Sequence, residues 1–310
     1  MVRIGTSGFY YEHWRGVLYP EGVGRSRWFE LYAREFDTVE MNSTFYHLPR
    51  ARTVEHWGQK APEGFLFSFK APRSVTHYKK LREVREELLR FLHLLKPIKA
   101  KIASLLFQLP PSLHRDEALL GEFLAELPHG GGWRYALEFR HESWYVESVY
   151  GILRHHGTAL VQHDYGRREV PEAATGPFGY LRLHGPDGHY RGSYDDAALE
   201  RWAEIVREHA AHHRPVFVYF NNDLEGNAVR DARRLRSLLA AEGFLPKESF
   251  DCLPSAPDIG SMGNPSEAST HLPGAPTFRP DPPADPSPGT SETNSNLSFG
   301  IISPKEKGDA

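Results

Sequence analysis

The chain has 310 residues, of which 40% are hydrophobic and 12% aromatic, so it can form a sizeable core in one large or two small domains. Its 37 lysines and arginines nearly balance its 40 aspartates and glutamates, which excludes a polycation that binds nucleic acid by bulk charge. The single cysteine excludes an intrachain disulfide and a cysteine metal cage.

The start of the chain carries no targeting signal that we recognise. The residues MVRIGTSGFYYEHW lack the apolar segment that follows the basic start of a signal peptide. No run of uncharged apolar residues approaches the length of a transmembrane helix. Together with the low cysteine count, these features predict a cytoplasmic protein without a membrane partner. They set no expectation for the oligomeric state.

Eight short runs of β-branched or apolar residues predict eight strands. They cover residues 2–6, 37–42, 65–70, 102–109, 134–139, 158–163, 178–183 and 215–220. Helical patterns separate most of them. The segment SRWFELYAREF, for example, places Trp28, Leu31, Tyr32 and Phe36 on one stripe. The link between the sixth and seventh runs lacks apolar periodicity and predicts a loop.

This alternation predicts an α/β protein, with a (β/α)8 TIM barrel over residues 1–243. An open doubly wound sheet is the alternative, but the segment after the first strand lacks the G-x-G-x-x-G pattern of its dinucleotide-binding form. Residues 244–310 are rich in Pro, Gly and Ser. Because such a segment cannot bury enough apolar surface to offset its ordering entropy, we expect a disordered tail.

Alternate residues of a barrel strand face the lumen and the outer helices, so the apolar positions assign the two faces. In the fifth strand, Tyr135, Leu137 and Phe139 would pack against helices, which leaves Glu138 and Arg140 inside. The sixth strand is ambiguous. The other strands together predict a polar lumen near the C-terminal mouth, lined by Glu40, Asn42, Lys70, Gln108, Glu138, Arg140, Arg182, His184, Tyr219 and Asn221. A structural network of ion pairs, such as Glu40 with Lys70 or Glu138 with Arg182, is the alternative explanation of these charges.

Seven motifs give the chain a family resemblance. They are IGTSGFYYEHWRGVLYP, FDTVEMNSTFYHLP, FSFKAPRSVTH, LFQLPPS, EFRHESW, YLRLHG and VYFNND, which together span residues 4–223. In this order they resemble the YecE-like family with domain of unknown function 72. The resemblance implies a (β/α)8 barrel and supplies no established activity. The architecture is similar to barrels of the xylose-isomerase and endonuclease-IV group, which act on sugars or nucleic-acid backbones, but this is fold-level analogy.

The mouth of the barrel is suited to an anion. The loop HGPDGHYRGSYD after the seventh strand combines glycines with His184, His189 and Arg191. Loops after the seventh and eighth strands of many barrels bind phosphate. Phosphate or carboxylate binding is therefore expected at this rim.

We hypothesise an enzyme, of the hydrolase, lyase or isomerase class, that acts on a small polar anionic, phosphorylated or sugar-like substrate by acid/base chemistry. Glu40, Glu138 and His184 are the catalytic candidates. The substrate-binding candidates are Asn42, Lys70, Gln108, Arg140, Asp164, Arg182, Tyr219 and Asn221. Common barrel glycosidases carry their two carboxylates at the ends of the fourth and seventh strands. Here those ends carry Gln108, Arg182 and His184, so a glycosidase is disfavoured. The alternative is a non-catalytic module that binds a ligand or nucleic acid in the same pocket.

No cofactor is predicted. A divalent metal on Glu40, Glu138, Asp164 and His184 is disfavoured, because three lumen cations compete for the carboxylates. Nucleic acid is not favoured as a partner either. The aromatic residues of the rim loops could stack on bases, but they serve equally well to cover the mouth; they are Tyr10, Tyr11, Trp14, Phe45, Tyr46 and Trp144.

Overall fold

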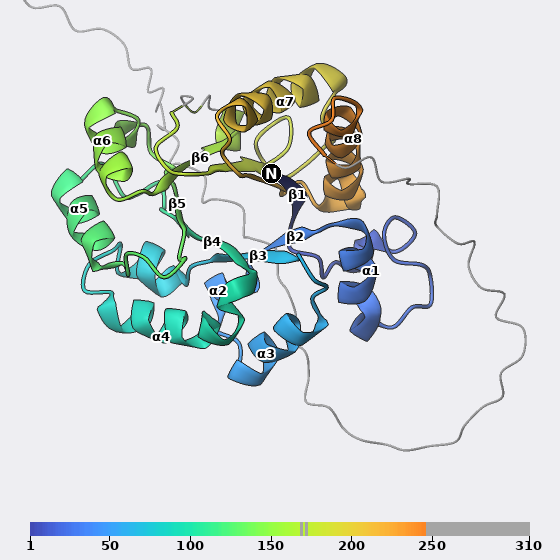
Figure 1. The fold of residues 1–310 in the computed structure, drawn as a ribbon, viewed down its shortest axis with the longest axis horizontal. Coiled ribbons are helices and arrows are strands. Elements are labelled where there is room, and N and C mark those ends of the chain that lie inside the picture. Colours follow the sequence, from blue (N-terminus) through green and yellow to red (C-terminus); the bar gives the residue numbers. More distant parts are fainter. Residues whose placement is uncertain (168–169, 171–172, 246–310) are drawn as a thin grey trace, which may run out of the picture. The chain divides into compact units, whose positions relative to one another are not determined.

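The computed structural model describes residues 1–167, 170 and 173–245, and its strands form a closed parallel barrel (Figure 1). Neighbouring strands follow chain order, and β8 pairs with β1 to close the sheet. The strands are β1 (Val2–Ser7), β2 (Thr38–Met41), β3 (Leu66–Lys70), β4 (Ile102–Gln108), β5 (Tyr135–Glu138), β6 (Ala159–His163), β7 (Gly179–Leu183) and β8 (Val216–Phe220). Each predicted strand is confirmed, with ends that differ by at most one residue.

Helices connect the strands and lie outside the barrel (Figure 1). The α-helices are α1 (Trp28–Glu35), α2 (Ser43–Tyr46), α3 (Ala51–Lys60), α4 (Arg85–Leu95), α5 (Glu117–Glu126), α6 (Glu147–His155), α7 (Asp196–Ala211) and α8 (Asn227–Ala241). Shorter helical turns are η1 (Glu12–Trp14), η2 (Arg25–Arg27), η3 (Ser74–Tyr78), η4 (Lys96–Lys101), η5 (Glu142–Trp144), η6 (Tyr165–Arg167) and η7 (Leu224–Gly226). Among them η3 is a π-helix. This arrangement confirms the predicted α/β barrel.

Aromatic residues fill the layer between the strands and the outer helices. Phe67 and Phe69 of β3 are both buried, and the ring of Phe29 on α1 stacks on that of Phe67 with centroids 5.8 Å apart. Burying each such side chain stabilises the fold by about 1.5–3 kcal/mol. The intervening Ser68 points the other way and lies within 2.8 Å of the Tyr219 hydroxyl. Ser68 thus shares the inner face with Lys70, which the sequence predicted to line the lumen.

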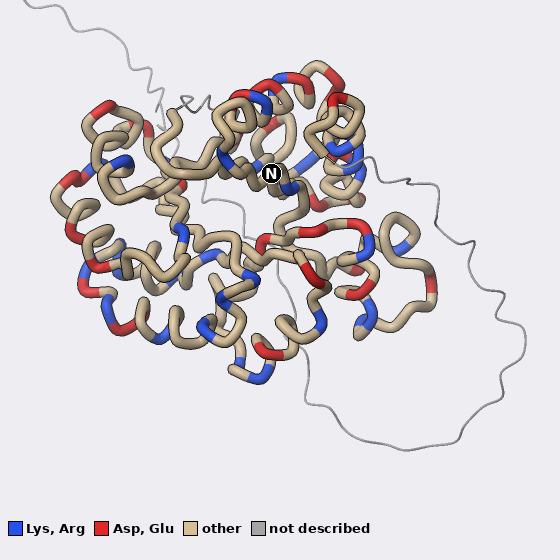
Figure 2. Tube along the Cα trace, in the orientation of Figure 1, with Lys and Arg blue, Asp and Glu red and all other residues tan. Residues whose placement is uncertain are grey.

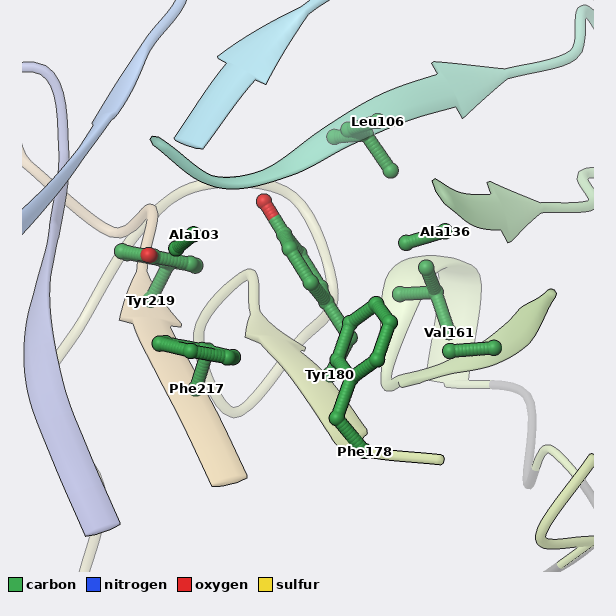
Figure 3. Close-up of a cluster of buried hydrophobic side chains, with 9 residues drawn as sticks. Ala103, Leu106, Ala136, Val161, Phe178, Tyr180, Phe217 and Tyr219 are labelled. Atoms are coloured by element: carbon green, nitrogen blue, oxygen red, sulfur yellow. The ribbon is translucent and has the colours of Figure 1, made fainter. Parts of the chain in front are cut away.

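An apolar cluster fills the lumen towards the N-terminal ends of the strands (Figure 3). It contains Ala103, Leu106, Ala136, Ala159, Val161, Phe178, Tyr180, Phe217 and Tyr219. The rings of Tyr180 and Tyr219 lie 5.2 Å apart and form its upper edge. Because Val161 belongs to this cluster, β6 turns its odd-numbered residues inward, which resolves the face that the sequence left ambiguous. Polar side chains occupy the lumen on the C-terminal side of this cluster, which we call the apolar floor.

Charges of both signs lie along the outer helices (Figure 2). On α7, for example, Arg207 pairs with Glu200 and with Glu242 at 2.8 and 2.6 Å. Exposed pairs of this kind contribute only about 0–1 kcal/mol each. The stability of the barrel therefore comes mainly from its buried layers.

Two predictions concern residues that the structure does not fully cover. The predicted tail at 244–310 lies outside the described residues from 246 onward, so its disorder and the domain boundary at 243 stay predictions. The predicted loop between β6 and β7 contains the turn η6, and its residues 168, 169, 171 and 172 also lie outside the described part. Within the described residues, no helix has the length and apolar character needed to cross a bilayer.

Candidate functional site

Arg182 of β7 joins two glutamates inside the lumen. Its Nη2 lies 2.7 Å from Oε1 of Glu40 on β2, and its Nη1 lies 2.7 Å from Oε2 of Glu138 on β5. Its Nε also donates to Oε2 of Glu40 at 2.9 Å. All three residues are at most 1% exposed. The predicted pairing of Glu138 with Arg182 is therefore present, and Arg182 also holds Glu40 by two parallel hydrogen bonds.

Glu40 has further donors. The hydroxyl of Tyr180 donates to its Oε2 at 2.6 Å, and the hydroxyl of Ser7 donates to its Oε1. The Ser7 oxygen in turn accepts a hydrogen bond of 2.7 Å from Nδ2 of Asn42. Glu40 is thus a fully bonded carboxylate, and Asn42 is tied to it through Ser7.

Glu138 is held as an anion by two guanidinium groups. Its Oε1 forms an ion pair with Nε of Arg140, and its Oε2 contacts Arg182. Burial alone would raise the pKa of Glu138, but the charges of Arg140 and Arg182 hold this pKa well below its usual range. The guanidinium of Arg140 also lies 3.7 Å over the ring of Tyr165. A charged Glu138 therefore serves to orient Arg140 at the mouth.

His184, at the end of β7, is neutral. Burial lowers its pKa well below the usual value, and the neighbouring charges of Arg140 and Arg182 lower it further. Its Nε2 lies 3.1 Å from Nη2 of Arg140 and 3.3 Å from Nη1 of Arg182. Since guanidinium groups only donate, Nε2 accepts and the proton is on Nδ1, which lies 3.4 Å from Oδ1 of Asp164.

Asp164 differs from the two glutamates in its access to solvent. Its side chain is 21% exposed, whereas those of Glu40 and Glu138 are fully buried. Its Oδ1 accepts a hydrogen bond of 2.6 Å from the backbone N–H of His184, and its Oδ2 accepts one from the hydroxyl of Tyr194. Partial burial outweighs these bonds and raises the pKa of Asp164 to about 6. Asp164 can therefore gain or lose a proton near neutral pH.

The remaining predicted residues occupy two levels of the lumen. Lys70 is 3% exposed, and its Nζ lies 4.2 Å over the ring of Phe45. Gln108 and Asn221 are also buried at the ends of β4 and β8, where Nε2 of Gln108 donates to the carbonyl of Leu109 at 2.8 Å. Tyr219 lies deeper, at the top of the apolar floor. The substrate-binding roles of these residues stay predictions.

Five residues of the site were not among the predicted candidates, and one of them is Tyr180 of β7, which donates to Glu40. Ser7 ends the first strand, whose faces the sequence did not assign. His163 is the last residue of β6, whose apolar pattern left the inward face undecided. Burial lowers the pKa of His163 to about 4, and its Nε2 lies 2.9 Å from the carbonyl of Phe139. Tyr165 and Tyr194 come from loops, for which strand alternation gives no signal.

Metal ligands are not gathered in the described part of the chain. Residues 1–167, 170 and 173–245 contain no group of three His, Cys, Asp or Glu side chains placed to hold a metal ion. The four residues considered from the sequence are divided, since Glu40 and Glu138 bind guanidinium groups while Asp164 and His184 contact each other. The prediction that no metal is used stays untested.

Comparison with known proteins agrees with this fold. Among curated proteins, the chain is similar to UPF0759 protein YunF of Bacillus subtilis (strain 168), at 27% identity over 80% of this chain and 99% of YunF. It is also similar to UPF0759 protein YecE of Escherichia coli (strain K12), at 34% identity over 38% of this chain and 43% of YecE.

Solved structures show the same likeness. A DUF72 family protein from Thermotoga maritima superposes with a TM-score of 0.71 at 30% identity, covering 77% of this chain and 99% of that one. A DUF72 family protein from Enterococcus faecalis shares the fold, with a TM-score of 0.67 at 21% identity over 77% of this chain and 96% of that one. The family model described as protein of unknown function DUF72 matches residues 3–251, so the chain belongs to the DUF72 family.

Proposed function

We propose that the protein is an enzyme that binds a small polar anionic, phosphorylated or sugar-like substrate at the C-terminal mouth and transforms it by acid/base chemistry. The charge balance of the lumen supports the anionic character of the substrate. Lys70, Arg140 and Arg182 carry three positive charges and Glu40 and Glu138 two negative ones, so these side chains hold one positive charge in excess while Asp164 is protonated. Buried cations in excess favour an anion that enters the site.

The acid/base part of the proposal rests on Asp164, which has a pKa near neutral pH and is accessible to solvent. It is the most accessible carboxylate of the network, and it contacts the imidazole of His184 beside the two arginines. A group that titrates near neutral pH can both accept and donate a proton during turnover. In this scheme Asp164 moves the proton, and Arg140 stabilises the charge that develops on the substrate.

The glutamates act differently in the same scheme. Glu40 accepts from Arg182 and from two hydroxyl groups, and both oxygens of Glu138 form ion pairs with arginines, so the principal contribution of these glutamates is to hold Arg182 and Arg140 in place. A direct catalytic role for either glutamate would require the substrate to displace one of these donors. Neutral His184, with its Nε2 facing the arginines, would keep Asp164 aligned with them.

The proposal is tested by identifying what binds and then asking whether it turns over. Native mass spectrometry of the purified full chain, followed by incubation with a panel of sugar phosphates and sugar acids, should reveal a bound compound and a product. Asp164→Asn keeps the shape of the side chain and should lower kcat by at least about 100-fold, with a smaller change in KM.

The matched control is Asp196→Asn, which changes an exposed aspartate at the start of α7. Its kcat should equal that of the wild type. Binding of a compound without turnover, or equal kcat for Asp164→Asn and Asp196→Asn, would refute the acid/base role. The first of these results would favour the binding-module alternative.

A further inference from the structure

A cavity lies at the C-terminal rim of the barrel. It has a volume of about 230 Å³ and is lined by α2, by η3 and by the first turns of α4. Phe45 connects it to the lumen, because this side chain lines the cavity while its ring lies 4.2 Å from Nζ of Lys70. The cavity is smaller than the ~300–1,000 Å³ of pockets for drug-sized ligands, so it suits a single ring.

Arg73 supplies a cation to this cavity. Its guanidinium carbon lies 5.8 Å from the ring centre of Tyr46 and 5.3 Å from that of Tyr78. Within the described residues, Arg73 forms no ion pair with a carboxylate. Aromatic rings contact the guanidinium but do not use its N–H groups, which are strong donors to phosphate or carboxylate oxygens. The guanidinium N–H groups of Arg73 can therefore donate to an anionic group in the cavity.

Glu87 supplies an acceptor to the same cavity. Its Oε1 lies 2.9 Å from Nζ of Lys79, and this contact holds the pKa of Glu87 below its usual range. Its Oε2 is buried and accepts no hydrogen bond from any described residue. A buried acceptor without a donor costs free energy, which a ligand hydroxyl recovers when the Glu87 side chain, which lines the cavity, turns Oε2 towards it. The cavity thus offers donors to an anion and an acceptor to a hydroxyl group.

The aromatic side chains add a surface on which a ring can lie. Tyr78 is 67% exposed at the edge of the cavity, which is unusual for a side chain of its size. The backbone that follows η3 is also strained, since Lys80 and Glu83 have φ values of 47° and 51°. Strain of this kind is concentrated at functional sites in folded proteins.

We propose that this rim cavity is a subsite for a phosphorylated or carboxylated sugar, in which Arg73 binds the anionic group and Glu87 accepts from a hydroxyl. The sugar ring lies against Tyr46 and Tyr78. The inference names the substrate class of the proposed function, and it rests on that function only for the idea that one ligand also reaches Lys70 and the lumen.

The test is isothermal titration of the full chain with glucose 6-phosphate, ribose 5-phosphate, glucuronate, glucose, inorganic phosphate and AMP. A charged sugar should bind at least about tenfold more tightly than glucose and inorganic phosphate, because only it satisfies both Arg73 and Glu87. AMP carries the same phosphate ester on a nucleoside, and it should bind more weakly than the best charged sugar. No binding by any charged sugar, or tightest binding by AMP, overturns the proposal.

Variants test whether binding depends on the residues of the subsite or only on the positive charge of the surface. Arg73→Gln should weaken binding of the charged sugar by about tenfold or more, and Glu87→Gln should reduce the preference over inorganic phosphate. Arg52→Gln removes an exposed arginine of α3 and should bind like the wild type. Circular dichroism checks that each variant is folded, and Tyr78→Ala provides a second test at an exposed position. Equal affinities for Arg73→Gln and Arg52→Gln overturn the proposal.

A lumen variant distinguishes this inference from the proposed function. If Arg73→Gln weakens binding and Arg140→Gln does not, the rim subsite stands and the lumen proposal fails for this ligand. If only Arg140→Gln weakens binding, the rim subsite is overturned while the proposed function survives. Loss in both variants supports a ligand that occupies the rim and the lumen together.

Discussion

Arg182 bridges Glu40 and Glu138, so one guanidinium from β7 pairs with carboxylates from β2 and β5 inside the barrel. Both carboxylates are fully buried, where a carboxylate without a cationic partner is strongly disfavoured. The lumen therefore has an internal ionic core above its apolar floor. Removing one member of such a core costs more than the core contributes as a whole.

Replacing Arg182 should show how much stability is lost when one member of the ionic core is removed. Arg182→Met leaves two carboxylates buried without their common cation, and it should lower the free energy of unfolding by about 3–5 kcal/mol. Urea unfolding at pH 7 measures the change. Arg207→Met, which breaks exposed pairs on α7, is the control and should cost at most about 1 kcal/mol. Similar small losses in both variants would show that the ionic core is not needed for folding.

The raised pKa of Asp164 predicts a pH-dependent stability. Its pKa of about 6 lies above the ordinary 3.8, so the folded protein holds the Asp164 proton more tightly than the unfolded chain does. The stability that this proton provides is complete below about pH 4 and is lost as the pH rises through 6. Asp164→Asn cannot lose a proton, so between pH 4 and pH 7 it should gain up to about 3 kcal/mol relative to the wild type.

Two measurements check this prediction. Urea unfolding at several pH values between 4 and 7 gives the difference between Asp164→Asn and the wild type. Carbon NMR of the aspartate side chains should show one carboxyl that titrates near pH 6 and is missing from the variant. A constant stability difference together with titration near pH 4 would mean that Asp164 is solvated like an ordinary surface aspartate.

The sequence carried enough information to predict the barrel and most of its lumen. Alternation along β3 and β5 placed Ser68, Glu138 and Arg140 on the inner face, because a buried apolar residue on one side of a strand fixes the other side. The same signal fails where both faces are buried. The β6 sequence ALVQH has apolar residues at successive positions, so the inward direction of His163 became visible only in the folded barrel.

The sequence suggested the pair of Glu138 with Arg182, but it did not show which cation contacts Glu40. Glu40 with Lys70 was one pair of the alternative structural network, and Arg182 is the cation that contacts both oxygens of Glu40. Strand order and register decide which side chains meet across a barrel, and these depend on the closure of the whole sheet. Ser7 contacts Glu40 across neighbouring strands for the same reason. Tyr194 reaches Asp164 from a loop, where no periodic signal exists.

His163 should show the opposite pH dependence to Asp164. Burial lowers its pKa to about 4 from the ordinary 6.5, so the unfolded chain binds a proton at pH values where the folded protein does not. The wild type therefore loses stability as the pH falls from 6.5 towards 4. His163→Gln should avoid this loss and gain up to about 3 kcal/mol relative to the wild type over that range.

The control for this effect is His155→Gln, because His155 is exposed on α6. Urea unfolding at pH 7, 6, 5 and 4 measures all three proteins. In the wild type the effects of His163 and Asp164 on stability partly cancel. On acidification, the stability of His163→Gln relative to the wild type should therefore rise, while that of Asp164→Asn should fall. Parallel pH curves for His163→Gln and His155→Gln would contradict the neutral, buried state of His163.

The contact between Arg140 and Tyr165 should stabilise the mouth through the aromatic ring. The guanidinium lies 3.7 Å over the ring, so Tyr165→Leu should lower the free energy of unfolding by about 1–2 kcal/mol, while Tyr165→Phe keeps the ring and should change it by less than about 0.5 kcal/mol. A double-mutant cycle with Arg140→Met isolates the pair from the contact between Arg140 and Glu138. Urea unfolding of the four proteins gives the coupling energy. A coupling near zero would mean that the ring only covers Arg140, and that contacts such as those with Glu138 and His184 orient this arginine towards the mouth.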